Sequence, residues 1–139
     1  MQEIKISDKK FFIKKTYVVY ASPERVFEAL TDPGIVAAWG GGLSVVETKK
    51  GGKFELFDGW VKGEVRSYLP AKELSYTWKP EDWSTKEAPS LVVYKFMVHP
   101  AGTEVILEHM GLPSQSETDK HVDGWMDFVF EPLNEYFTR

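Results

Sequence analysis

His109 carries the strongest case for chemistry among the ionisable residues of this sequence. It lies in an alternating stretch that places it on the same face as Val105 and Leu107, so the imidazole is expected to point inward from a strand. A partly buried imidazole could orient a ligand carbonyl, or act as an acid or base near neutral pH. The competing interpretation is a core histidine whose ring nitrogens are satisfied by hydrogen bonds to neighbouring groups.

The other histidines, the glycines, the serines and the lack of cysteine argue against several kinds of site. His99 stands at a predicted turn and His121 at a predicted helix start, and both are expected to face solvent. Three histidines so placed give no metal-ligand spacing, so neither a metal site nor a cofactor is expected. The glycine pairs and the glycine triplet match no phosphate-binding loop, and no serine lies in a GxSxG motif. The chain has no cysteine, which excludes disulfides and a cysteine nucleophile.

Aromatic residues are abundant, and they could wall a cavity as well as fill a core. Nine Phe, six Tyr and five Trp make up 14% of the 139 residues. Tyr and Trp combine an apolar body with one polar group, which suits a pocket that needs a few directed contacts. The residues expected to line such a pocket are Trp39, Val65, Tyr76, Trp78, Tyr94, Phe96, Leu107, His109, Trp125, Phe128 and Val129. Ordinary core packing is the alternative for each of them.

Several segments have the composition and the alternation of strands. They are residues 10–20, 43–49, 53–57, 60–69, 73–79, 91–99 and 103–110. Short turn signals such as Gly51-Gly52 and Asp58-Gly59 separate consecutive segments, which indicates an antiparallel meander. In the segment 91–99 the alternation places Val92, Tyr94, Phe96 and Val98 on the face opposite Lys95.

Three helices are predicted, two short ones after the first strand and one long one toward the C-terminal end. Ser22-Pro23 and Asp32-Pro33 each give a helix start, with a capping side chain followed by proline at the first helical position. After a polar loop at 111–117, a long helix is indicated by an apolar stripe of Val122, Trp125, Met126, Val129, Leu133, Tyr136 and Phe137. Pro132 lies inside this stripe and removes a helical hydrogen bond, so a kink or an early end of the helix is expected there.

The order of these elements predicts an α+β fold, organised as one domain over residues 1–139. A curved antiparallel sheet of six or seven strands, with two short helices after the first strand, would wrap around the long C-terminal helix. The net charge is −4 and the basic residues are scattered, which argues against nucleic acid as the main partner. No apolar run approaches the ~20 residues needed to cross a membrane. A cytoplasmic location is therefore expected.

The ordered set of motifs resembles the Bet v 1-like, START-related superfamily, and within it the branch named after the activator of Hsp90 ATPase. The stretches that carry the resemblance are Ser22 to Pro33, Trp39 with its following glycines, Gly51-Gly52-Lys53-Phe54, the strand around Gly63, residues 74–78 and residues 108–125. The resemblance implies a helix-grip fold with a hydrophobic cavity between the sheet and the long helix. Gly41-Gly42 departs from the bulkier residues usual after the Trp and is expected to widen one entrance.

Three functions are compatible with this resemblance. The leading hypothesis is a non-catalytic protein that binds a small hydrophobic or lipid-like molecule in the cavity between sheet and helix. The second is a co-chaperone-like module that interacts with an Hsp90-type chaperone. The third is an enzyme of the cyclase or dehydratase type that uses His109 with a tyrosine such as Tyr94. A homodimer is also plausible, although the sequence specifies no interface for it.

Overall fold

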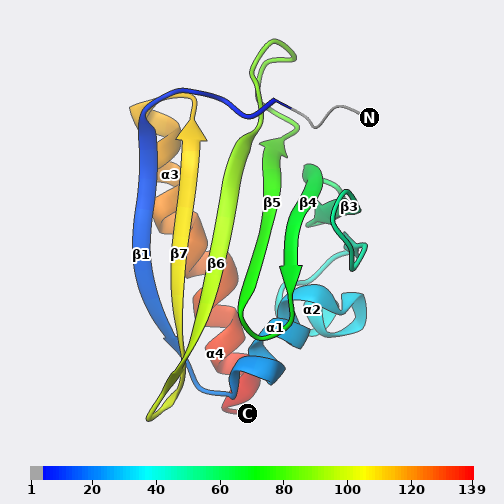
Figure 1. The fold of residues 1–139 in the computed structure, drawn as a ribbon, viewed down its shortest axis with the longest axis vertical. Coiled ribbons are helices and arrows are strands. Elements are labelled where there is room, and N and C mark those ends of the chain that lie inside the picture. The colour runs from blue at the N-terminus through cyan, green and yellow to red at the C-terminus, as the bar shows by residue number, and fades with distance from the viewer. Residues whose placement is uncertain (1–4) are drawn as a thin grey trace.

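A computed structural model of the protein describes residues 5–139 and shows a sheet that curves around one long helix (Figure 1). The strands are β1 (Phe11–Val19), β2 (Val45–Val46), β3 (Lys53–Leu56), β4 (Val61–Leu69), β5 (Glu73–Pro80), β6 (Ser90–His99) and β7 (Gly102–Leu112). The helices are α1 (Pro23–Thr31), α2 (Pro33–Trp39), α3 (Gln115–Trp125), the π-helix η1 (Met126–Phe130) and α4 (Glu131–Phe137).

Within residues 5–139, seven strands form one antiparallel sheet in the order β1-β7-β6-β5-β4-β3-β2. From β2 to β7 each strand pairs with the next along the chain. Strand β1 pairs with β7 and is the edge strand opposite β2. This arrangement confirms the predicted α+β, helix-grip fold. The segment predicted as a strand at 43–49 is shorter than expected, since only Val45 and Val46 pair with β3.

The two short helices begin where the capping signals place them. The Ser22 side chain accepts a hydrogen bond from the backbone N–H of Arg25, and the Asp32 side chain accepts from Gly34 and Ile35. A proline follows each cap at the start of its helix. The indole of Trp39 donates to the carbonyl oxygen of Ala29 at 2.6 Å, which ties α2 to α1 and leaves this tryptophan buried in the core.

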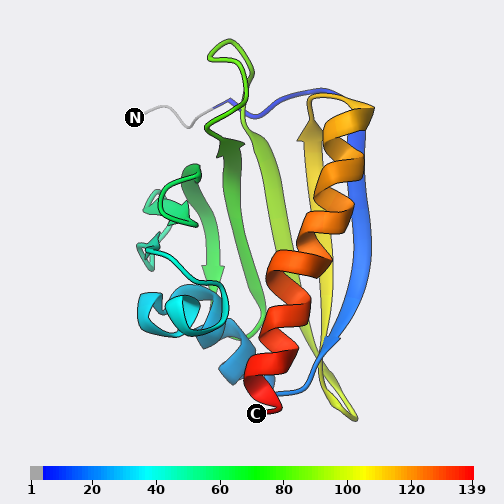
Figure 2. The ribbon, with the colours of Figure 1, turned by 180° about the vertical axis from the view of Figure 1, so that it is seen from behind.

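Segments α3, η1 and α4 run on from one another as one long helix across the concave face of the sheet (Figure 2). The helix begins at Gln115 with Ser114 as its cap, so the expected polar loop extending to residue 117 is wrong. Pro132 does not end the helix. Instead, the turn before it widens to π geometry, and the N–H of Glu131 bonds to the carbonyl of Met126. The chain then resumes an α-helix, with Pro132 in the first turn, where a missing N–H is tolerated.

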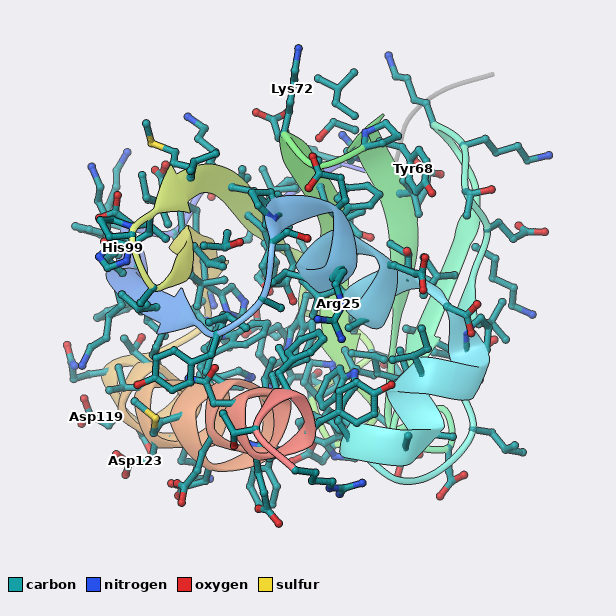
Figure 3. All side chains as sticks on the ribbon, turned by 90° about the horizontal axis from the view of Figure 1, so that it is seen from below. Arg25, Tyr68, Lys72, His99, Asp119 and Asp123 are labelled. Carbon is teal, nitrogen blue, oxygen red and sulfur yellow. The ribbon has the colours of Figure 1, made fainter. Side chains whose placement is uncertain are left out.

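One face of the long helix packs on the sheet and the opposite face is open to solvent. Asp119 and Asp123 point away from the sheet on that outer side (Figure 3). Beside the lower end of the helix, the β6–β7 hairpin extends past the ends of the β4 and β5 strands (Figure 2). Val98 is near the end of β6 and is 85% exposed, so the long helix does not cover this end of the face that carries Val92, Tyr94 and Phe96.

Candidate functional site

An apolar pocket of about 220 Å³ lies between the sheet and the long helix. Phe57 and Trp60 enter it from the β3–β4 connection, Trp78 from β5, and Asp82 from the loop after β5. The long helix supplies the rest of the wall: Glu117, Lys120, His121, Gly124, Trp125, Phe128 and Val129. Trp78, His121, Trp125 and Val129 are buried, whereas Phe128 is 64% exposed and stands at the rim.

The structure brings four of the sequence-predicted ligand residues into this pocket, namely Trp78, Trp125, Phe128 and Val129. The others are buried in the hydrophobic core and do not line it: Trp39, Val65, Tyr76, Tyr94, Phe96, Leu107 and His109. Gly41 and Gly42 also lie outside the pocket lining. Both have positive φ, and a side chain at Gly42 would meet the carboxylate of Asp58.

His121, expected to face solvent, is instead buried in the pocket wall, so that prediction is wrong. The indole N–H of Trp78 donates to its Nε2 at 3.1 Å, and its Nδ1 is 2.8 Å from the carbonyl oxygen of Glu117. An Nε2 that accepts a bond carries no proton, so this pattern assigns the neutral tautomer protonated at Nδ1. Burial lowers the pKa of His121 despite the opposing effect of the Glu117 carbonyl and the nearby carboxylates.

His109 points inward as predicted, but it lies behind the pocket rather than in it. The indole N–H of Trp125 donates to His109 Nδ1 at 3.1 Å, and His109 Nε2 lies 2.8 Å from the hydroxyl of Ser90. That hydroxyl in turn bonds to the carbonyl oxygen of Trp78 at 2.7 Å. Burial, together with the charge that a protonated His121 would carry nearby, holds the pKa of His109 well below its usual range. The geometry is that of the competing interpretation, a core histidine satisfied by its neighbours.

Tyr94, the proposed partner of His109 in an enzyme, is engaged elsewhere. Its hydroxyl bonds to the hydroxyl of Tyr76, and both rings are fully enclosed. Burial raises the pKa of both phenols, so both stay protonated at neutral pH. Neither the phenols nor His109 reach the pocket, and the structure therefore gives no support to the cyclase or dehydratase hypothesis.

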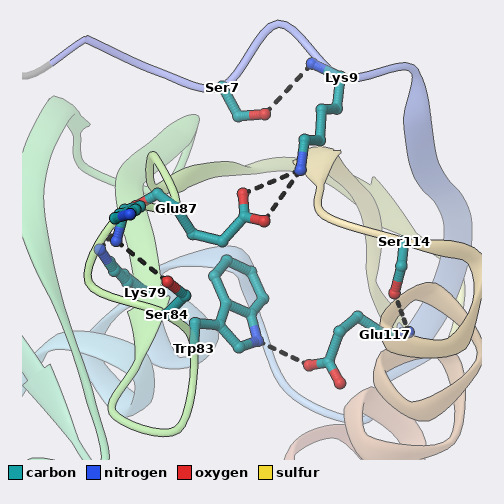
Figure 4. Close-up of polar contacts among 9 residues, drawn as sticks. Ser7, Lys9, Lys79, Trp83, Ser84, Glu87, Ser114 and Glu117 are labelled. Carbon is teal, nitrogen blue, oxygen red and sulfur yellow. Dashed lines mark hydrogen bonds and ion pairs between the residues drawn. The ribbon is translucent and has the colours of Figure 1, made fainter.

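The rim of the pocket is held by a polar contact between the β5–β6 loop and the long helix. The indole N–H of Trp83 donates to the carboxylate of Glu117 at 2.6 Å (Figure 4). Lys120 lies 3.3 Å from the other oxygen of that carboxylate. Partial burial acts to raise the pKa of Glu117, but the bonds from Trp83 and Lys120 and the charge of Lys120 outweigh it and lower the pKa. A salt bridge between Lys9 and Glu87, 2.9 Å long, joins the same loop to the segment that precedes β1.

The helix residues that line the pocket follow a pattern that the sequence does contain. Glu117, Lys120, His121, Gly124 and Trp125 are spaced at i, i+3, i+4, i+7 and i+8, which is one helical face. Because most residues of this face are polar or small, a prediction from hydrophobicity alone places the face in solvent. Among residues 5–139 no group of three acidic, His or Cys side chains could hold a metal ion. Nor does any helix in that range have the length and apolar character to span a membrane.

Residues 20–138 match the family model described as Activator of Hsp90 ATPase homolog 1-like protein. The chain belongs to this family. This membership confirms the resemblance drawn from the ordered motifs.

Curated relatives carry the same family name. The human protein called Activator of 90 kDa heat shock protein ATPase homolog 1 is 28% identical over 134 residues, which is 96% of this chain. The corresponding mouse protein is 28% identical over 134 residues as well. In both cases the match covers 38% of the relative, so this chain spans well under half the length of these relatives.

Solved structures with the same fold include shorter proteins. A structure described as PFC0360w, an HSP90 activator from Plasmodium falciparum, has a TM-score of 0.79 and 27% identity, covering 93% of this chain and 96% of that one. Protein MLL2253 from Mesorhizobium loti has a TM-score of 0.80 and 24% identity, covering 93% of this chain and 98% of that one. The second similarity establishes the fold alone.

Proposed function

We propose that this protein binds a small apolar molecule in the pocket between the β3–β4 connection, β5 and the long helix. The observation that carries the proposal is a space of about 220 Å³ whose lining includes five aromatic side chains: Phe57, Trp60, Trp78, Trp125 and Phe128. A cavity of about 150 Å³ lined by apolar side chains is known to take up benzene, so a substituted single ring is of suitable size for this one. Aromatic walls with a few polar groups at the edge are typical of small-molecule sites.

Gly124 offers a way to close the pocket without disturbing the fold. A methyl group placed on its Cα would meet only the Phe128 ring, at 3.9 Å, so a longer side chain can extend into the empty space. We expect Gly124→Met to fill the pocket while keeping the helix, since methionine is a better helix former than glycine. Binding of a neutral probe such as n-butylbenzene should fall at least about ten-fold, measured by amide chemical-shift titration.

The matched control is Asp123→Met, which places the same side chain on the solvent side of the same helix (Figure 3). This variant should bind the probe as the unmodified protein does. If n-butylbenzene shifts no resonances of the pocket residues, or if Gly124→Met binds it unchanged, the pocket is not a ligand site.

A second function, interaction with an Hsp90-type chaperone, is favoured by the relatives. The matches to proteins named as activators of Hsp90 ATPase cover 96% of this chain, and the Plasmodium protein described as an HSP90 activator is covered almost end to end. We expect the chain to change the ATPase rate of a purified Hsp90 at tens of micromolar. An unchanged rate at that concentration would contradict this function.

Three further expectations from the sequence stay predictions. These are the organisation of residues 1–139 as a single domain, the cytoplasmic location and the homodimer.

A further inference from the structure

The lining of the pocket carries more negative than positive groups. Asp82 and Glu117 bring two carboxylates to the lining, and Lys120 brings one ammonium group. Lys120 lies 3.3 Å from Glu117, so its charge is directed at that carboxylate. Both carboxylates also act on His121 in the pocket wall, where the charge of each favours the protonated imidazole. A ligand at the mouth of the pocket therefore meets an excess of negative charge.

Two indole N–H groups of the pocket wall already have acceptors in the protein. The indole N–H groups of Trp78 and Trp125 are bonded to His121 and His109, so neither is free to donate to a ligand. The Trp83 N–H at the rim is bonded to Glu117. What these rings still offer is their π surface, which carries the negative part of the aromatic quadrupole and attracts cations.

We propose that the ligand of this pocket is a cation with an aromatic or apolar body, either a quaternary ammonium or a protonated amine. The inference rests on the function proposed above and adds the class of ligand. The apolar body would contact the buried rings of Trp78 and Trp125, and the cationic group would lie among Trp60, Phe128 and the carboxylates. Aromatic rings combined with carboxylates are a common way to bind quaternary ammonium groups.

The same chemistry separates a simple cation from a choline phospholipid head group. A phosphocholine group carries a phosphate next to its ammonium, and that phosphate would approach Asp82 and Glu117. The phosphate and the two carboxylates are all negatively charged, and their repulsion would oppose binding. Free phosphocholine should therefore bind more weakly than a quaternary ammonium that carries no phosphate.

The test compares probes of equal shape and different charge on the unmodified protein. Benzyltrimethylammonium and neopentylbenzene have the same skeleton, with a positive nitrogen in the first and a carbon in the second. We expect the cation to bind at least about ten-fold more tightly than its neutral isostere, measured by calorimetry or by amide chemical-shift titration. Phenylacetate, an anion of similar size, should bind more weakly than either, and added salt should weaken only the cation.

Two matched pairs of substitutions test whether the carboxylates at the pocket cause the preference for a cation. Asp82→Asn with Glu117→Gln removes both pocket carboxylates and keeps an acceptor for Trp83. Asp119→Asn with Asp123→Asn makes the same change in charge on the outer side of the helix (Figure 3). The first pair should lower the affinity for benzyltrimethylammonium at least about five-fold and leave neopentylbenzene unchanged, and the second pair should alter neither.

The outcomes separate this inference from the proposed function. If neopentylbenzene or phenylacetate binds as tightly as the cation, the ligand class is wrong and the pocket remains a ligand site. If phosphocholine binds as tightly as benzyltrimethylammonium, a lipid head group replaces the simple cation. If none of these probes binds the unmodified protein, the proposed function and this inference both fail.

Discussion

Acidification from about pH 7.5 to about pH 5.5 is expected to lower the free energy of unfolding by as much as about 1.4 kcal/mol for each of the two buried histidines. In the folded protein, burial lowers the pKa of both His109 and His121. In the unfolded chain the same rings take up a proton as the pH falls through about 6.5. The unfolded state then binds more protons, so stability falls as the pH falls and is fully present above that value.

The hydrogen bonds give this pH dependence its structural cause. His109 Nδ1 accepts from Trp125, and His121 Nε2 accepts from Trp78. Protonation of either acceptor would remove the lone pair and set two N–H groups against each other inside the core. Acid would therefore break the hydrogen bonds that the indoles of Trp78 and Trp125 make in the pocket wall.

Urea unfolding at several pH values measures the effect. His109→Gln and His121→Gln should each remove about half of the pH-dependent loss of stability. His99→Gln is the control, because His99 lies at the end of β6, away from both tryptophans. A pH dependence that is the same in all three variants and in the unmodified protein would contradict this assignment.

The strands and the short helices could be predicted because their signals are local. Alternation in Leu74, Tyr76 and Trp78 sets a face of β5 whatever its neighbours are, and all three are buried. The capping side chains Ser22 and Asp32 act within one turn of the backbone. The meander then follows from short connections between consecutive strands.

The long helix shows where local signals stop being sufficient. Its buried face runs through His121, Trp125, Val129 and Leu133 at intervals of four residues. An α-helix of 3.6 residues per turn drifts from such spacing. The widened turn in η1 takes up the drift, and it leaves Met126, predicted in the apolar stripe, 45% exposed.

The position of the pocket could not be predicted, because it depends on which aromatic side chains meet across the sheet. Phe54 stacks on Tyr76 at 3.6 Å between ring centroids, and Tyr94 bonds to Tyr76, so this part of the core is filled. The empty space is displaced toward the β3–β4 connection, where Phe57 and Trp60 stand. His121 was missed for a related reason, since its partner Trp78 lies 43 residues away in the chain.

Gly63→Ala is expected to destabilise the protein by about 3 kcal/mol or more, through a clash that no side-chain movement can relieve. A methyl group on Gly63 would lie 1.8 Å from the backbone carbonyl oxygen of Thr77 on the neighbouring strand. The strands β4 and β5 approach closely here, and the Thr77 hydroxyl accepts a hydrogen bond from the Glu64 N–H at 2.8 Å. Chemical denaturation measures the loss.

The clash acts on a part of the sheet that supports the pocket. The register between β4 and β5 shifts between Val65 and Ser67, just beyond the close approach. Trp78 follows Thr77 directly, so moving the two strands apart would also move a wall of the pocket. Gly63→Ala should therefore weaken binding of n-butylbenzene under conditions where the variant is still folded.

Gly51→Ala separates this clash from the general effect of replacing glycine. Gly51 has φ of 83°, and a methyl group there meets nothing within 4 Å, so only the unfavourable backbone conformation contributes. That cost is about 1 kcal/mol and leaves the pocket untouched. If Gly63→Ala were no more destabilising than Gly51→Ala, β4 and β5 would have to separate easily at this point. The contact with Thr77 would then not be what holds Trp78 in place.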